Sequence, residues 1–151
     1  MMVDLQRQKN YKMRNYTNLL RRKAINSNRN GKYTYTEVNS IKSKLCEYLI
    51  IDDKEFVVLY KPNNSYWVLL TGSSILYFLN NIVREIFYEE IKNKEVYFHY
   101  YKNYYYDNEM ILSDHIKIER KKDSELIILP IEILSVFSFS EPINFILTKL
   151  N

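Results

Sequence analysis

Few residues of this chain belong to the types that carry acid–base or nucleophilic chemistry. Two histidines, His99 and His115, and one cysteine, Cys46, are spread over 151 residues. An imidazole titrates near neutral pH and can act as a general acid or base. His99 stands between Phe98 and Tyr100 on a predicted strand. One hypothesis is therefore a small metal-independent ribonuclease that uses His99, although a strand histidine more often has a structural role.

The other familiar catalytic patterns are missing from the sequence. With only Gly31 and Gly72, the chain cannot form a glycine-rich dinucleotide loop or a P-loop. The cysteine and the histidines lack the spacing of a zinc site, so we expect no metal and no cofactor. Cys46 lies on the apolar side of a predicted helix, as a structural thiol does. Glu89 and Glu90 are adjacent and diverge on a strand, so they form no carboxylate pair. These patterns favour a non-enzymatic protein.

Composition sets the class of protein. The chain has 46% hydrophobic and 26% charged residues, which is typical of one globular domain with a proper core. A single cysteine excludes an internal disulfide and fits a reducing compartment. We expect a cytoplasmic protein without a membrane span, because no signal-peptide core or long apolar run is evident. Fifteen tyrosines favour β structure with polar aromatic surface.

Charge divides the chain into two parts. Residues 1–32 hold nine Lys or Arg and only Asp4 as an acid, a net charge of +8, whereas the remainder is −4. We interpret 1–32 as a basic helical arm with an apolar stripe that includes Tyr16 and Leu20, and 33–151 as one domain. The arm either binds phosphate or a partner, or is a solvated helix packed on the body. Its candidate contacts are Arg14, Arg21, Arg22 and Lys23.

The centre of the predicted sheet is a hairpin over Tyr66–Asn80. Its two apolar runs are joined by Gly72 and Ser73, and glycine in the first position suits a type II′ turn. Neither face of the first run is polar, so we expect the hairpin in mid-sheet with both faces covered. Further strands are predicted at Glu55–Tyr60, Ile82–Tyr88, Val96–Tyr101, His115–Arg120 and Glu125–Leu129. Asn80-Asn81 forms a turn because asparagine tolerates positive φ.

Two helices flank these strands. Thr34 and Glu37 have the spacing of a capping box at the start of a helix that ends near Asp52. Pro142 suits the first position of a C-terminal amphipathic helix. The segment Pro130–Phe139 fits neither the strand nor the helix period.

The order of these elements resembles small bacterial pleckstrin-homology-like (PH-like) domains over residues 55–150. The resemblance rests on YWVLLTGSSILYFLN, a strand, YEEI at Tyr88–Ile91, the hairpin IKIERKKDSELIIL and a last helix. It implies an α+β fold: an antiparallel sheet or partly open PH-like barrel of about seven strands, with a C-terminal amphipathic helix and an N-terminal helical extension. The loop Lys61–Ser65 lacks the basic cluster of phosphoinositide-binding members, and Trp67 lies in a strand rather than the closing helix, so lipid binding is not implied.

Tyrosine gathers in one segment, residues 97–107, which we call the Tyr-rich segment. Tyrosine is favoured in protein interfaces because it gives large contact area at low rotamer cost. We therefore predict a protein-interaction module, by analogy an immunity-type or phage-encoded inhibitor. The predicted partner-binding residues are Tyr97, His99, Tyr101, Tyr104, Tyr105, Tyr106 and Asp107.

An alternative function is a single-stranded nucleic-acid-binding protein. The arm would neutralise phosphates, and the tyrosines would stack on bases. The acidic residues Asp107, Glu109 and Asp114 near the tyrosines argue against it.

Overall fold

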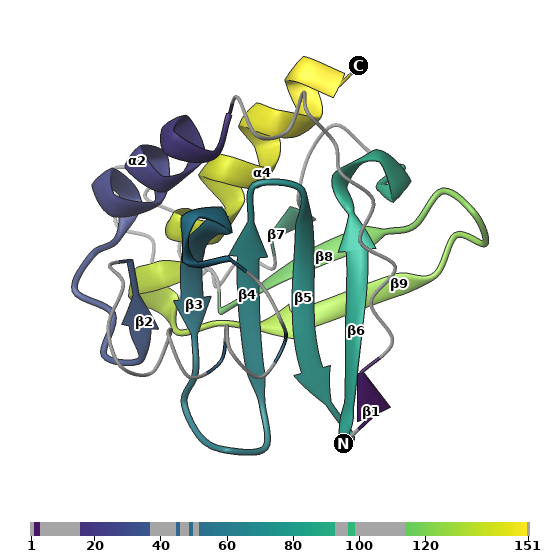
Figure 1. Cartoon of the computed structure of the whole chain (residues 1–151), viewed down its shortest axis with the longest axis horizontal. Helices are drawn as coiled ribbons and strands as arrows, with labels where there is room; N and C mark the ends of the chain where they lie inside the picture. Colours follow the sequence, from purple (N-terminus) through teal and green to yellow (C-terminus); the bar gives the residue numbers. More distant parts are fainter. Residues whose placement is uncertain are drawn as a thin grey trace, which may run out of the picture.

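The computed structural model describes residues 2–3, 16–36, 45, 49, 52–92, 97–98 and 114–150. Within them, two sheets and two helices form an α+β fold (Figure 1). The larger sheet has the order β1-β6-β5-β4-β3-β2 and the smaller the order β7-β8-β9. Strands β2 to β6 are antiparallel neighbours, and β1 joins β6 in parallel.

The element bounds follow the chain. The larger sheet comprises β1 Met2–Val3, β2 Thr34–Tyr35, β3 Phe56–Tyr60, β4 Trp67–Thr71, β5 Ser74–Leu79 and β6 Ile82–Phe87. The smaller sheet comprises β7 Tyr97–Phe98, β8 His115–Glu119 and β9 Leu126–Pro130. The helices are α2 Thr17–Ser27 and α4 Val136–Leu150, with short 3-10 turns η1 Asp53–Glu55, η2 Tyr88–Glu90 and η4 Ile133–Ser135.

The predicted meander and both predicted hairpins are confirmed. The β4–β5 register pairs Trp67 with Phe78, and β8 pairs with β9 along its length. Asn80 and Asn81 have φ angles of 53° and 66°, so this turn uses the positive φ that asparagine tolerates.

The central strands of the larger sheet are buried on both faces, as the sequence predicts for the hairpin over Tyr66–Asn80. Strands β3 and β4 each hold five consecutive buried residues. The inner face, with Val58 and Leu70, packs against the smaller sheet, α2 and α4. The outer face, with Trp67 and Leu69, packs against Leu49. Figure 1 shows the smaller sheet crossing behind the upright strands of the larger one.

The predicted type II′ turn at Gly72 is wrong. Neither glycine has a positive φ, which that turn requires. A Cβ on Gly72 would lie 2.0 Å from Oγ1 of Thr17 at the start of α2. Glycine is therefore needed for the close approach of α2, which short-range turn rules do not reveal.

The prediction that the last helix starts at Pro142 is also wrong, because α4 begins six residues earlier and Pro142 lies inside it. A proline inside a helix costs roughly 3 kcal/mol or more. Here the helix continues because Val136 and Phe139 extend its buried stripe to Ile143. The undecided segment 130–139 thus holds the end of β9, η4 and the first turn of α4.

The capping-box prediction fails as well. Thr34 lies in β2 opposite Tyr60, and its hydroxyl donates to Glu132 Oε2 at 2.9 Å. Leu45 and Leu49 are helical, as expected. The rest of that predicted helix lies outside the described residues.

The two sheets meet at a corner without closing into a barrel in the described part of the chain. Ile91 forms an antiparallel bridge with Arg120, and the Lys92 N–H donates to the Glu119 carbonyl at 2.8 Å. The predicted α+β class, antiparallel strands and C-terminal helix are therefore found, and the described strands form two sheets that do not close into a barrel.

One stretch, Ile133–Leu150, is long and apolar enough to cross a membrane by length and composition. The sequence pattern does not predict such a run, because Glu141 and several serines interrupt it. Half of the stretch is buried in the fold, as in the core helix of a globular protein, so it is a weak indication of a membrane span.

Ion pairs tie the β8–β9 hairpin to β6. Arg84 Nη2 lies 2.8 Å from Glu125 Oε1, and Arg120 Nη2 lies 2.6 Å from Asp123 Oδ2. The hydrogen bond from Arg84 lowers the pKa of Glu125. The hydrogen bond from Arg120 lowers the pKa of Asp123 from 3.8 to about 2. These groups are at the surface, so the network contributes modestly and is weakened by salt.

We expect the Gly72→Ala variant to be destabilised by about 1–3 kcal/mol through overpacking against Thr17. The double variant Gly72→Ala with Thr17→Ala should regain part of that free energy, because the overlapping hydroxyl is gone. Urea denaturation of the four proteins of this cycle measures the coupling. Strictly additive effects would show that the two residues do not press on each other.

Acid should weaken the ion-pair network. Because the folded-state pKa of Asp123 is lowered, its contribution is present above the ordinary value of 3.8 and is lost as the pH falls to about 2. A variant with Arg84→Gln and Arg120→Gln should therefore show a shallower fall in Tm between about pH 4 and pH 2 than the native chain. Lys122→Gln, in the same hairpin tip, is the matched control. Parallel Tm curves for native and double variant would contradict this assignment.

Candidate functional site

The predicted partner-binding surface falls almost wholly outside the described residues. Tyr97 is the exception: it lies in β7 and pairs with Lys117 of β8. This places the start of the Tyr-rich segment in the smaller sheet. The six other predicted residues lie outside the described residues: His99, Tyr101, Tyr104, Tyr105, Tyr106 and Asp107. The structure therefore does not test the nuclease hypothesis, which depends on His99.

Arg21, one of the predicted arm contacts, binds backbone within the protein. Its Nε and Nη2 donate to the carbonyl of Phe56 at 2.9 and 2.6 Å, and Nη2 also donates to the carbonyl of Lys54 at 3.1 Å. A guanidinium offers several donors in a rigid fork, which suits converging carbonyls. Arg21 thus fixes α2 to the start of β3. The sequence gives no signal for this role, because carbonyl acceptors occur at every residue.

The other basic residues of α2 differ in their surroundings. Lys23 Nζ lies 4.7 Å from the centre of the Phe145 ring, and Lys149 Nζ lies 5.4 Å from the same ring. Such cation–π contacts hold the ammonium groups on the helix pair. Arg22 is exposed. Arg14, the fourth predicted contact, lies outside the described residues.

The basic segment is interpreted either as a binding arm or as a helix packed on the body. The placement of α2 agrees with the packed helix. Leu20 and Ala24 are fully buried in the core, and Tyr16 packs edge-on against Phe145 with ring centres 6.0 Å apart. Where the domain boundary falls stays a prediction.

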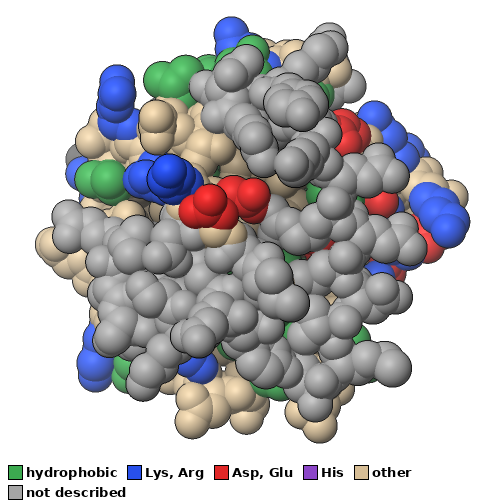
Figure 2. Space-filling model, viewed as in Figure 1, with side chains coloured by type: hydrophobic (Ala, Val, Ile, Leu, Met, Phe, Trp, Pro, Cys, Tyr) green, Lys and Arg blue, Asp and Glu red, His purple; other side chains and the backbone are tan. Residues whose placement is uncertain are grey.

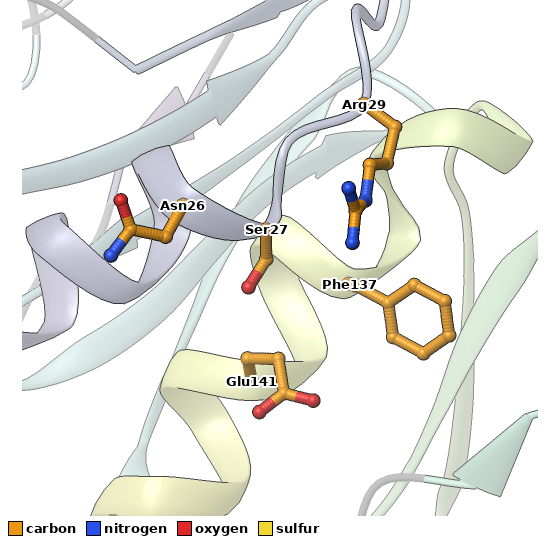
Figure 3. Close-up of a pocket in the computed structure, with 5 residues that line it drawn as sticks. All are labelled: Asn26, Ser27, Arg29, Phe137 and Glu141. Atoms are coloured by element: carbon orange, nitrogen blue, oxygen red, sulfur yellow. The ribbon is translucent and has the colours of Figure 1, made fainter.

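A shallow pocket of about 260 Å³ lies where the end of α2 meets the start of α4 (Figure 3). It is lined by Asn26, Ser27, Arg29, Phe137 and Glu141, with Arg29 reaching toward the Phe137 ring. The lining offers one cation and one carboxylate, which suits a small polar ligand. It holds neither a histidine nor a second carboxylate, so these five residues do not make an acid–base pair.

The second histidine lies at the start of β8. His115 Nδ1 is 2.7 Å from Oδ1 of Asp114, the residue before it. This contact orients the ring at the strand end. Among the described residues, no three His, Cys, Asp or Glu side chains come together as metal ligands would.

The outer face of β9 carries two exposed large apolar side chains. Leu126 and Ile128 are 60% and 50% exposed, while Ile127 and Leu129, which alternate with them along the strand, are buried. We call Leu126 and Ile128 the β9 edge pair. The sequence pattern predicts only an apolar strand here. The partner strand carried the missing signal, because Glu119 and Lys117 pair with these two residues and residues paired in an antiparallel ladder share a face.

Charged side chains gather at the tip of the same hairpin. Lys121 and Lys122 are exposed there, next to the ion pair of Arg120 with Asp123. Figure 2 shows blue and red side chains clustered at the right edge, where the hairpin extends beyond β6 in Figure 1.

Comparison of the chain with family models, curated proteins and solved structures finds no match. Function must therefore be inferred from the residues and their placement.

Proposed function

We propose that this protein is a non-enzymatic protein-interaction module whose binding surface joins the Tyr-rich segment to the outer face of the smaller sheet. The observation that carries the proposal is the exposure of Leu126 and Ile128 on the sheet that also contains Tyr97. Large apolar side chains that stay exposed together on a strand favour contact with another protein. Tyr97 of this sheet begins the Tyr-rich segment, which adds a residue type that is enriched in such contacts.

The PH-like resemblance is part of this proposal. A four-stranded meander β3 to β6, then the three strands β7 to β9, then α4 agrees with the expected order of two antiparallel strand groups closed by a helix. The packing of α2 against α4 is an addition to that outline. The narrower placement as an immunity-type or phage-encoded inhibitor, and as a cytoplasmic protein, rests on analogy of size and composition alone.

The placement of α2 weakens the case for nucleic-acid binding. Phosphate neutralisation needs cations that are free to approach a backbone. Arg21 is engaged with carbonyls, and Lys23 lies on an aromatic ring, which leaves Arg22 as the exposed basic residue of this helix. We therefore rank nucleic-acid binding second and the His99 nuclease third.

The test of the main proposal is capture of a partner from an extract of the source organism by the tagged full chain. We expect replacement of Tyr104, Tyr105 and Tyr106 by serine to reduce the captured partner at least about tenfold, as the loss of interface hot spots does. Tyr33→Ser, a change at an exposed tyrosine outside the Tyr-rich segment, is the matched control and should capture normally. If the tyrosine variant captures as much partner as the native chain does, the binding surface does not include these three tyrosines.

Nucleic-acid binding is tested with short fluorescent RNA and DNA strands across a salt series. Removing residues before Asn30 would also remove the buried Leu20 and Ala24, so charge substitutions are the better comparison. We expect no binding at physiological salt by the full chain. A log–log salt slope that becomes shallower by about one in each of Arg14→Gln and Arg22→Gln would establish a phosphate contact at each position and reverse the ranking.

A further inference from the structure

The open edge of the smaller sheet is short and has a definite pattern. In the order β7-β8-β9, β9 is the edge strand of the described sheet. The Arg120 N–H donates to the Glu125 carbonyl, and the Ile131 N–H donates to the Asp114 carbonyl. Hydrogen-bonded pairs alternate along an antiparallel ladder. Residues 125, 127, 129 and 131 therefore turn their backbone groups toward β8, and residues 126, 128 and 130 turn theirs outward.

One end of this outward row is already used. Pro130 has no N–H, and its carbonyl accepts a hydrogen bond of 2.8 Å from the Tyr66 hydroxyl. What stays open is the β9 edge pair, with one N–H and one C=O from each of Leu126 and Ile128. Within the described part of the chain, no hydrogen bond to these four groups is found.

The chemistry of this edge specifies its occupant. Donors and acceptors that recur at every second residue match another extended backbone, whereas a helix has already used its own backbone groups. Because the side chains of Leu126 and Ile128 are apolar and exposed, a strand that pairs with them should carry apolar side chains at alternate positions. The ammonium groups of Lys121 and Lys122, exposed at the hairpin tip, call for a carboxylate at one end.

Resting on the proposed interaction function, we infer that the β9 edge pair binds an extended segment of the partner protein, which adds to the smaller sheet as a further strand. Its backbone pairs with Leu126 and Ile128, its alternate apolar side chains cover theirs, and an acidic residue at one end faces Lys121 and Lys122. Strand addition of this kind gives affinity through the backbone and specificity through alternate side chains.

The test uses two fluorescent seven-residue peptides that alternate valine and threonine, with two aspartates at either the N- or the C-terminal end. We expect fluorescence anisotropy of the full chain to show binding of one of the two, which also gives the strand direction. The same peptide with alternate backbone nitrogens methylated should not bind. Equal binding of the methylated peptide would overturn the inference.

A variant pair separates backbone from side chain. Ile128→Pro removes an outward N–H without touching the β8 ladder, and Ile128→Thr removes apolar surface while keeping the N–H. We expect the proline variant to bind about tenfold more weakly and the threonine variant to lose less. Lys121→Glu with Lys122→Glu should also weaken binding. An unchanged affinity of the proline variant contradicts strand addition.

Amide hydrogen exchange keeps the inference testable if the proline variant does not fold. In the free native chain the amides of Leu126 and Ile128 should exchange fast while those of Ile127 and Leu129 are protected, and the peptide should slow the first pair. Protection of the first pair in the free monomer would mean that the chain covers its own edge. Protection that rises with protein concentration would mean that a second copy does, and either result overturns the inference.

The two proposals fail separately. If Ile128→Pro captures the cellular partner as well as the native chain does while the tyrosine variant does not, the interaction function stands and the edge assignment fails. If the peptides bind but no partner is captured by the native chain, the edge assignment stands and the proposed function fails.

Discussion

Burial of the larger sheet on both faces is the constraint from which the rest of this structure follows. Five consecutive buried residues in β3 and again in β4 leave neither face available to water. One face is covered by the smaller sheet with α2 and α4, and against the other pack Leu49, Leu45 and Tyr35 among the described residues. A strand buried on both faces needs two covering layers, and these add helices to what would otherwise be a simple meander.

The covering layers explain why the basic N-terminal segment is partly structural. The start of α2 touches Gly72 at the β4–β5 turn, and the guanidinium of Arg21 holds the carbonyl of Phe56 at the start of β3. Gly72 and Arg21 thus position α2 at a turn and at a strand end. From composition alone, the glycine would be assigned to a loop and the arginine to a phosphate site. Net charge over a segment therefore overstates the charge that is available to a ligand.

Local patterns in the sequence were sufficient for strands β3 to β6, β8 and β9, for the Asn80-Asn81 turn and for the two-sided burial of the central hairpin, because these depend on periods of two and on nearby turn residues. Contacts distant in sequence decided the rest. Thr17 sets the need for glycine at 72, the apolar stripe carries α4 through Pro142, and Glu132 draws Thr34 into a strand. For the site, the types of residue could be predicted but not which of them the fold already uses, since that depends on acceptors such as backbone carbonyls.

The distribution of protecting residues along β9 favours an edge that binds a specific strand over an edge that is simply left unpaired. Natural edge strands are protected by proline, by lysine and by inward charges that prevent pairing with another chain. Here Pro130 with the Tyr66 hydroxyl closes one end, and Lys121 and Lys122 stand at the other. A device that served only to prevent pairing would also place charge at 126 or 128, where leucine and isoleucine stand exposed. Protection at the ends and apolar surface between them limits pairing to a short segment of the right sequence, which a specific partner can supply and random aggregation cannot.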